Sequence, residues 1–170
     1  MSKNRHCQES LTLDRLKQAV SYNPETGAFV RLLTRGCSKR GDVLGWANRD
    51  GYLLAKVDGQ EYMLHRLAWF YMYGAWPKHE IDHINGVRHD NRIVNLRDVT
   101  KSVNQQNRKG PQQGASSAYL GVSYFKETGR WRAQIKINGK KKSIGYFSTE
   151  EEAYTAYLEV KRQLHEGNTL

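Results

Sequence analysis

The sequence predicts an α+β fold divided into two modules, and three observations support this division. Short runs with the two-residue alternation of β-strands are interspersed with segments of helical periodicity along the 170 residues. The run RKGPQQGASSA, which contains no large apolar residue, has the composition of a linker. Most of the net positive charge lies around and after this run. We expect an N-terminal domain over residues 1–107, a linker over 108–118 and a C-terminal domain over 119–170.

The composition excludes several classes of protein. Hydrophobic residues make up 38% of the chain and aromatic residues 11%, which is enough to build a folded core. No apolar run reaches the roughly 20 residues of a membrane helix, and the N-terminus lacks the apolar segment of a signal peptide. The two cysteines, Cys7 and Cys37, are too few for a disulfide scaffold or a four-cysteine zinc site. We therefore expect a soluble chain with no membrane partner, working in a reducing compartment, the cytoplasm.

The distribution of charge indicates a polyanionic partner. The formal net charge is +10, and the stretch from Lys101 to Gly145 holds ten Lys and Arg residues but a single acidic residue, Glu127. Aromatic residues are interleaved with these bases, as is typical of surfaces that bind nucleic acids. No basic amphipathic helix carries the charge, which disfavours a membrane surface. The alternative is an ordinary solvated surface.

The C-terminal module is predicted to be a three-stranded sheet covered by one helix. The strands are expected over Tyr119–Phe125, Arg130–Ile137 and Lys141–Phe147, and a helix starts at the capping box formed by Thr149 and Glu152. The middle strand alternates strictly between polar and apolar residues, so the helix covers the apolar face. The free face is suited to lie against DNA, unless it is simply solvated. The residues expected to bind DNA are Arg130, Arg132, Gln134, Lys136 and Lys142.

The same segment resembles the AP2/ERF family of DNA-binding domains. The resemblance rests on the runs YLGV from Tyr119, WRAQI from Trp131, IGYF from Ile144 and EEAYTAY from Glu151. It implies a three-stranded sheet that docks in the major groove of double-stranded DNA. The sequence preferences of that family do not carry over to this chain, because its base-contacting positions vary.

In the N-terminal module, helices and strands alternate. Asn23-Pro24 is expected to end the first helix, Asp58-Gly59 to turn one strand into the next, and the polar stretch Gly36–Gly45 to be an exposed loop. The predicted helices are Thr12–Val20 and His65–Tyr73, and the predicted strands are Gly27–Leu33, Tyr52–Val57 and Gln60–Leu64.

The run His79-Glu80-Ile81-Asp82-His83 matches the H-E-x-x-H pattern of zinc peptidases. That chemistry requires both histidines on one face of a helix. Pro77 precedes the run and the turn signal Asn85-Gly86 follows it directly, so a helix is not expected here. A zinc peptidase therefore remains the least favoured of the functions considered.

A strand, loop, strand and helix fit the same region better. We expect strands over Glu80–Ile84 and Leu96–Val99, a polar loop over Asn85–Asn95 between them, and a helix capped by Thr100 that runs through Asn107. With Asp82, His83, Asn95 and Asn104 at their spacing, and with the runs IDHING from Ile81, DNR from Asp90 and NLR from Asn95, the segment resembles the HNH family of ββα-metal nucleases, in its phage and homing-endonuclease branch.

The resemblance implies a site with one hard metal ion. Asn104 stands where the last histidine of the family motif would be, and Asp82 is the first metal ligand. A carboxylate and an amide oxygen favour Mg²⁺ or Mn²⁺ over zinc.

The residue types also predict the roles of the remaining groups. His83 is the candidate whose ordinary pKa lies near neutrality, so it suits activation of a water molecule, with His89 as the alternative base. By resemblance, Asn95 pins the loop and helps to orient His83. The expected phosphate contacts are Arg88, Arg92 and Arg97.

These expectations converge on a metal-dependent DNA endonuclease of the phage homing type, targeted to double-stranded DNA by its C-terminal domain. If the gene is carried by a phage, the compartment is the cytoplasm of a bacterial host. The alternative is a DNA-binding protein whose HNH fold is catalytically idle. No feature of the sequence indicates a protein partner, and the oligomeric state stays open, with a monomer among the alternatives.

Overall fold

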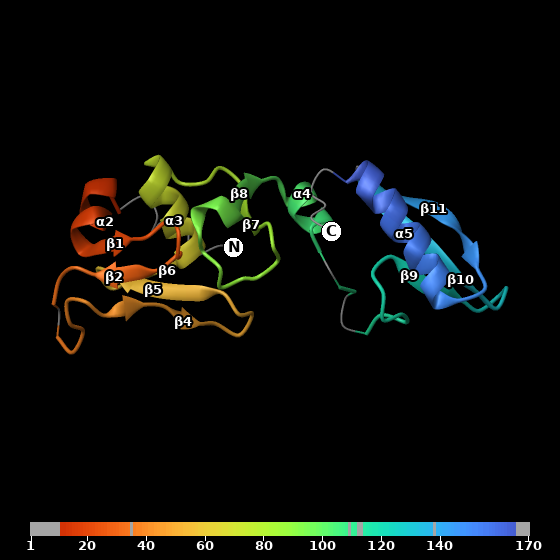
Figure 1. Ribbon diagram of the computed structural model, residues 1–170, viewed down its shortest axis with the longest axis horizontal. Helices are drawn as coiled ribbons and strands as arrows, with labels where there is room; N and C mark the ends of the chain where they lie inside the picture. Colours follow the sequence, from red (N-terminus) through yellow and green to blue (C-terminus); the bar gives the residue numbers. More distant parts are fainter. Residues whose placement is uncertain (1–10, 35, 109, 112–113, 138, 166–170) are drawn as a thin grey trace. The chain divides into compact units, whose positions relative to one another are not determined.

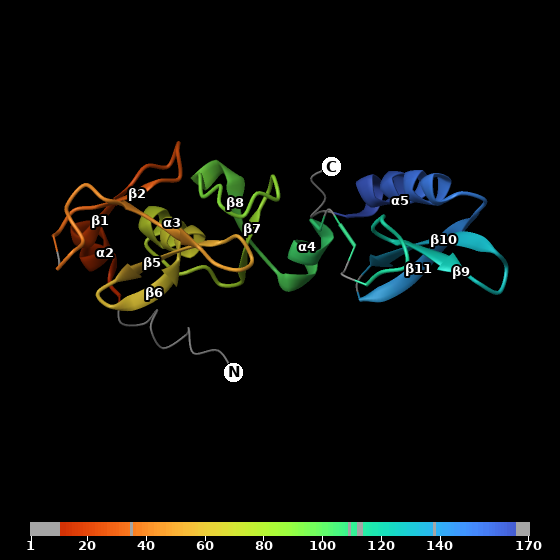
Figure 2. The same cartoon turned by 90° about the horizontal axis from the view of Figure 1, so that it is seen from below.

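The computed structural model describes residues 11–34, 36–108, 110–111, 114–137 and 139–165, and its chain divides into two compact units (Figures 1 and 2). The first unit is Met1–Asp98 and the second is Val99–Leu170. The boundary between the units, after Asp98, precedes the predicted end of the first domain at residue 107. The helix after Thr100 therefore belongs to the second unit. Parts of the predicted linker, at 109 and 112–113, and the predicted turn residue 138 lie outside the described residues.

The first unit consists of short strands around one central helix. Its strands form two three-stranded sheets, in the orders β1-β2-β3 and β4-β5-β6, and the two-stranded sheet β7-β8. Its elements are α2 (Leu13–Ala19), β1 (Val20–Tyr22), β2 (Phe29–Arg31), β3 (Val43–Leu44), β4 (Trp46–Ala47), β5 (Leu53–Val57), β6 (Gln60–Met63), α3 (Leu64–Tyr73), β7 (Glu80–His83), the 3₁₀ turn η1 (Ile93–Asn95) and β8 (Leu96–Val99).

The first helix is shorter than predicted. Thr12 caps it, because the Thr12 side chain accepts a hydrogen bond from the backbone N–H of Arg15. The prediction that the helix extends through Val20 is wrong: Val20 begins β1 and lies opposite Arg31 of β2. Val20 is buried and β-branched, and such a residue packs well in a strand.

The turns of the first unit were partly predictable. Asp58 and Gly59 both have positive φ, 51° and 84°, as the predicted two-residue hairpin between β5 and β6 requires. The stretch Gly36–Gly45 is not only a loop, because it contains β3, where Val43 lies opposite Val30. A two-residue strand is too short to show periodicity in the sequence.

The second unit is a three-stranded antiparallel sheet packed on one helix. Its elements are α4 (Lys101–Gln106), β9 (Val122–Phe125), β10 (Arg130–Ile137), β11 (Lys140–Phe147) and α5 (Glu150–Leu164). The strand β10 lies in the middle of the sheet, and Figure 2 shows α5 running along one face of it. The predicted capping box is confirmed, with hydrogen bonds in both directions between Thr149 and Glu152. In the part of the chain that the structure describes, no helix combines the length and apolar character needed to cross a bilayer.

Each unit has its own hydrophobic core. In the first unit, Leu67 and Ala68 of α3 are fully buried against residues of the surrounding strands, such as Phe29 and Ala55. In the second unit, Ala133 and Ile135 of β10 pack with Ala153 and Tyr157 of α5. The helix therefore covers the apolar side of β10, and the polar side of β10 faces away from α5.

Candidate functional site

The strand β7 carries the two central candidate residues, and both are buried. Asp82 is 6% exposed and His83 is 4% exposed. Successive side chains of a strand point to opposite faces, and their contacts agree with this rule. Asp82 contacts Arg97 of the neighbouring strand β8, whereas His83 contacts Asn91 and two aromatic rings.

His83 is surrounded by two rings and the side-chain amide of Asn91. Its ring centroid is 5.1 Å from that of His65 and 5.8 Å from that of Tyr52, and its Nε2 lies 3.3 Å from Oδ1 of Asn91. Burial lowers the pKa of His83, and the contact with Asn91 and the charge of Asp82 partly oppose this effect. A lowered pKa keeps the imidazole neutral near pH 7, which is the form that can accept a proton.

His65 has a supporting position beside His83. It is buried in α3, and burial, followed by the neighbouring His83 and Arg66, lowers its pKa to about 3. A histidine with this pKa stays uncharged at neutral pH and gives the pocket an aromatic wall. Its Nδ1 has no hydrogen-bond partner among the described residues.

Asn95 pins the loop that follows β7. Its side-chain oxygen accepts a hydrogen bond of 2.9 Å from the backbone N–H of Asn85, and its amide nitrogen donates one of 2.8 Å to the backbone carbonyl of Asp90. Both ends of the loop are thereby tied to one buried side chain. The side chain that contacts the His83 ring, however, is that of Asn91.

The Asp82 carboxylate suits a hard cation, but Arg97 already contacts one of its oxygen atoms. The Nε and Nη2 atoms of Arg97 lie 2.8 and 2.7 Å from Oδ2 of Asp82. Carboxylate and amide oxygens, as in Asp82 and Asn104, are ligands that Mg²⁺ and Mn²⁺ prefer. No group of three or more His, Cys, Asp and Glu side chains suited to a metal ion occurs in the described ranges. A cation at Asp82 would therefore share or displace the contact with Arg97.

The predicted set is divided between the two units. Asp82, His83 and Asn95 lie in the first unit around β7 and β8, whereas Asn104 lies on α4 in the second unit and is half-buried. Thr100 caps α4 as predicted, by accepting a hydrogen bond from the N–H of Val103.

The three arginines expected at phosphates all have partners within the first unit. Besides the pair of Arg97 with Asp82, Arg92 forms an ion pair of 2.6 Å with Asp90. Arg88 donates to the backbone carbonyl of Asp50 and stacks over the ring of Tyr52. Their role at DNA stays a prediction.

The H-E-x-x-H run has no helix to support a peptidase site. Glu80–His83 forms the strand β7, as expected from the turn that follows it. His79 is exposed and lies near Asp98, while His83 is buried. The geometry of a zinc peptidase is therefore missing here.

The polar face of β10 carries the predicted basic row. Arg132 lies opposite Tyr146 of β11 and Ser123 of β9, and its guanidinium lies 5.1 Å from the centre of the Phe125 ring. Tyr146 is 45% exposed. Arg130, Gln134 and Lys136 share this face of β10 by the alternation of the strand.

A β-bulge changes which lysine of β11 joins this face. The register shifts between Ala133 and Gln134, so that Lys142 lies opposite the buried Ile135 and Lys141 lies opposite Lys136. Directly opposed residues share a face of the sheet. Lys141 therefore belongs to the basic face. The prediction placed Lys142 there, but the extra residue at the bulge reverses the alternation of β11 beyond it.

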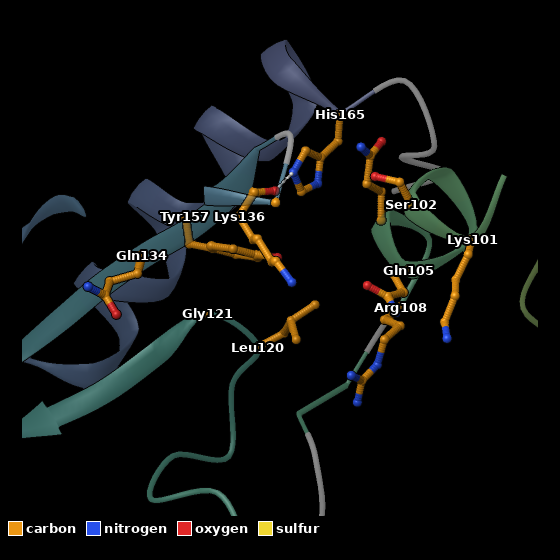
Figure 3. A pocket seen from close by; sticks show the side chains of 12 residues that line it. Lys101, Ser102, Gln105, Arg108, Leu120, Gly121, Gln134, Lys136, Tyr157 and His165 are labelled. Atoms are coloured by element: carbon orange, nitrogen blue, oxygen red, sulfur yellow. Dashed lines mark hydrogen bonds between the residues drawn. The ribbon is translucent and has the colours of Figure 1, made fainter. Parts of the chain in front are cut away.

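A pocket of about 440 Å³ in the second unit adds to the basic character (Figure 3). None of the described residues that line it is acidic. Burial raises the pKa of Tyr157 to about 12, so its hydroxyl remains a hydrogen-bond donor. The lining suits an anion such as a phosphate group. Its main side chains are Lys101, Gln105, Arg108, Lys136, Tyr157 and His165.

Sequence reasoning missed two residues of the His83 pocket, Asn91 and Tyr52. Asn91 stands in the run Asp90-Asn91-Arg92, which contributes to the resemblance to the HNH family, but the sequence assigned Asn91 no role. Only its near-complete burial, at 1% exposure, distinguishes it. Tyr52, which directly precedes β5, contacts His83 from a distant part of the sequence, and no local pattern predicts such a contact.

Comparison with known proteins agrees with the geometry of this region. A family model described as HNH endonuclease matches residues 62–106, which include α3, β7, β8 and α4. This match supports an HNH nuclease module in the matched segment. No solved structure matches the chain.

Proposed function

We propose that this protein is a metal-dependent DNA endonuclease of the phage homing type, with His83 as the general base and the basic sheet of the second unit as its DNA-binding surface. The observation that carries the proposal is the position of His83, a buried imidazole at the end of β7, within the segment that matches the HNH endonuclease model. Burial favours the neutral form of this imidazole, and its contacts with the His65 ring and with Asn91 orient it.

The reaction is hydrolysis of one phosphodiester bond. His83 takes a proton from a water molecule, the water oxygen attacks the phosphorus atom, and the bond to the 3′ oxygen breaks. The departing 3′ oxygen takes up a proton from solvent, the proton on His83 later returns to solvent, and the products are a 5′ phosphate and a 3′ hydroxyl. Asn95 keeps the loop after β7 in place while this occurs.

Asp82 and Asn104 are the residues that would hold a divalent ion, for which Mg²⁺ or Mn²⁺ is the best match to their oxygen atoms. When bound, such an ion supplies charge neutralisation at the phosphate and at the departing oxygen. Arg97 contacts Asp82 in the structure. If a metal ion takes this place at Asp82, Arg97 can contact a phosphate oxygen instead. Arg88 and Arg92 are further candidates for phosphate contacts.

The second unit supplies affinity for double-stranded DNA. The basic face of β10 and Lys141 fit a groove and its phosphates, in the manner implied by the AP2/ERF resemblance. Two DNA-binding modules on one chain raise the overall affinity, because binding of one raises the effective concentration of the other.

The test is cleavage of supercoiled plasmid and phage genomic DNA by the full-length protein in Mg²⁺, Mn²⁺ or EDTA. We expect nicked or linear products with 5′ phosphate ends in either metal and none in EDTA. DNA that is bound in a gel-shift assay but stays intact in both metals, on genomic DNA rich in different sites, would favour the catalytically idle alternative.

A further inference from the structure

We infer that Asn91 is a positioning residue for His83, and that the hairpin formed by β1 and β2 holds Asn91 in place. The inference rests on the proposed nuclease function and deepens it. The hairpin precedes residue 62 and so lies outside the segment that matches the HNH endonuclease model.

The contact between Asn91 and His83 selects one state of the imidazole. Oδ1 of Asn91 lies 3.3 Å from Nε2 of His83, and an amide oxygen can only accept a hydrogen bond. The contact is therefore a hydrogen bond when Nε2 carries the proton. In the neutral ring the lone pair is then on Nδ1, so Asn91 defines both the orientation and the tautomer of the base.

Packing alone does not account for an amide at position 91. The side chain is almost fully buried, and among the described residues nothing accepts a hydrogen bond from its Nδ2. A buried donor without an acceptor is destabilising, whereas an apolar side chain of similar volume would fill the space without this loss. The contact of Oδ1 with His83 is what an apolar residue could not provide.

The main chain around Asn91 is held at three points, two of them in the hairpin. The hydroxyl of Tyr22 in β1 donates a hydrogen bond of 2.8 Å to the carbonyl of Asn91. The N–H of Ile93 donates to the carbonyl of Pro24 at 3.2 Å. Asn95 binds the carbonyl of Asp90 on the other side.

The turn of the hairpin lies directly against the peptide that follows Asn91. Gly27 has a φ of +75°, and a Cβ built on it would lie 2.6 Å from the backbone carbon of Asn91 and from the backbone nitrogen of Arg92. Only glycine allows both this conformation and this approach. The hairpin therefore determines where Asn91 lies, and Asn91 determines how His83 is presented.

The first test is spectroscopic and does not require catalysis. Full-length protein is labelled with ¹⁵N-histidine, and the His83 signals are assigned with the variant His83→Gln. At about pH 8, two-bond ¹H–¹⁵N correlation spectra are expected to show His83 with its proton on Nε2. Asn91→Leu is expected to lose this single tautomer, whereas Asn91→Asp, which keeps an acceptor oxygen, is expected to retain the proton on Nε2.

The second test is kinetic. For Asn91→Leu, kcat for plasmid nicking is expected to fall on the order of tenfold to a hundredfold while KM for DNA changes less than about twofold. Gly27→Ala is expected to change kcat in the same direction. Thr12→Ala serves as the control, because it removes the cap of α2 and destabilises the same unit without touching the His83 pocket. If Asn91→Leu does not fold, Asn91→Ala replaces it in both tests.

The outcomes separate this inference from the proposed function. Wild-type protein with the His83 proton on Nδ1, or an Asn91→Leu variant with unchanged His83 signals and unchanged kcat, would overturn the inference. If that variant is unchanged while His83→Gln abolishes cleavage, the nuclease stands and the positioning role does not. If wild-type protein cleaves nothing but Asn91→Leu alters the tautomer, the positioning role stands and the nuclease does not.

Discussion

Asp82 and His83 are neighbours in the chain, but their side chains have different partners. The Asp82 carboxylate is paired with the Arg97 guanidinium, whereas the His83 imidazole contacts two rings and the amide of Asn91. Burial lowers the pKa of His83 and so favours the neutral imidazole. The two residues are thus suited to different tasks at one phosphate, proton transfer and charge neutralisation.

The pair of Asp82 and Arg97 should contribute to stability as well as to chemistry. We expect Asp82→Ala to lower the free energy of unfolding by about 2 kcal/mol, because the half-buried guanidinium of Arg97 loses this carboxylate. The double variant with Arg97→Ala should be destabilised by less than the sum of the two single variants. Urea unfolding of the four proteins measures this coupling, and strictly additive effects would contradict it.

The ion pair of Asp90 with Arg92 should make the free energy of unfolding depend on pH. The hydrogen bond from Arg92 is the main cause that lowers the pKa of Asp90 to about 2, from an ordinary value of 3.8. A lowered pKa stabilises the folded state above pH 3.8, and this contribution disappears as the pH falls through about 2. Asp90→Asn should therefore lower the free energy of unfolding by up to about 1 kcal/mol at pH 7, since the pair is partly exposed. In urea titrations the difference from wild type should shrink between about pH 4 and pH 2, and a difference independent of pH would show that the ionic contact is unimportant.

At the scale of elements, the main departures from the sequence predictions have local physical causes. The N-cap of α4 and the capping box of α5 follow short-range rules and were predictable. The end of α2 was not predictable, because the pairing of Val20 in β1 with Arg31 in β2 outweighs the helical propensity of the sequence. The bulge in β11 was not predictable either, since a single extra residue cannot be recognised in the sequence of a lysine-rich strand.

The bulge leads to a test with two adjacent lysines. Arg132→Ala should weaken binding to double-stranded DNA and reduce the slope of log K against log salt by about one. Lys141→Ala should have a similar effect, because Lys141 lies opposite Lys136 on the basic face. Lys142→Ala is the matched control and should weaken binding less, because Lys142 lies opposite the buried Ile135. Equal losses for both lysines, measured by fluorescence anisotropy at several salt concentrations, would show that the face of the sheet does not determine the contact.

At the scale of the whole molecule, the candidate site could be predicted only in part. The spacing of Asp82, His83, Asn95 and Asn104 pointed to the nuclease family, and the family model matches the segment that contains them. The residues that support His83, such as Tyr52 and Asn91, could not be predicted. They come from different parts of the chain, and their role depends on burial and on contacts across sheets.

The proposed organisation, with one nuclease module and one DNA-binding module, predicts the type of cut. A single catalytic site acts on one strand at a time, and the two strands of a duplex have opposite polarity. A monomer should therefore nick its target and convert supercoiled plasmid to the open circular form. Light scattering during the reaction establishes the oligomeric state, and clean double-strand breaks made by a proven monomer would refute the prediction.

The most direct test of the central claim compares wild type, His83→Ala and His89→Ala in one plasmid cleavage assay with Mg²⁺. His89 is an exposed histidine six residues further along the same loop region, so its variant controls for the loss of an imidazole near the site. We expect His83→Ala to bind DNA normally and to lose at least about a hundredfold in cleavage rate, while His89→Ala keeps the wild-type rate. Full cleavage by His83→Ala, or a selective loss in His89→Ala, would contradict the assignment of His83 as the base.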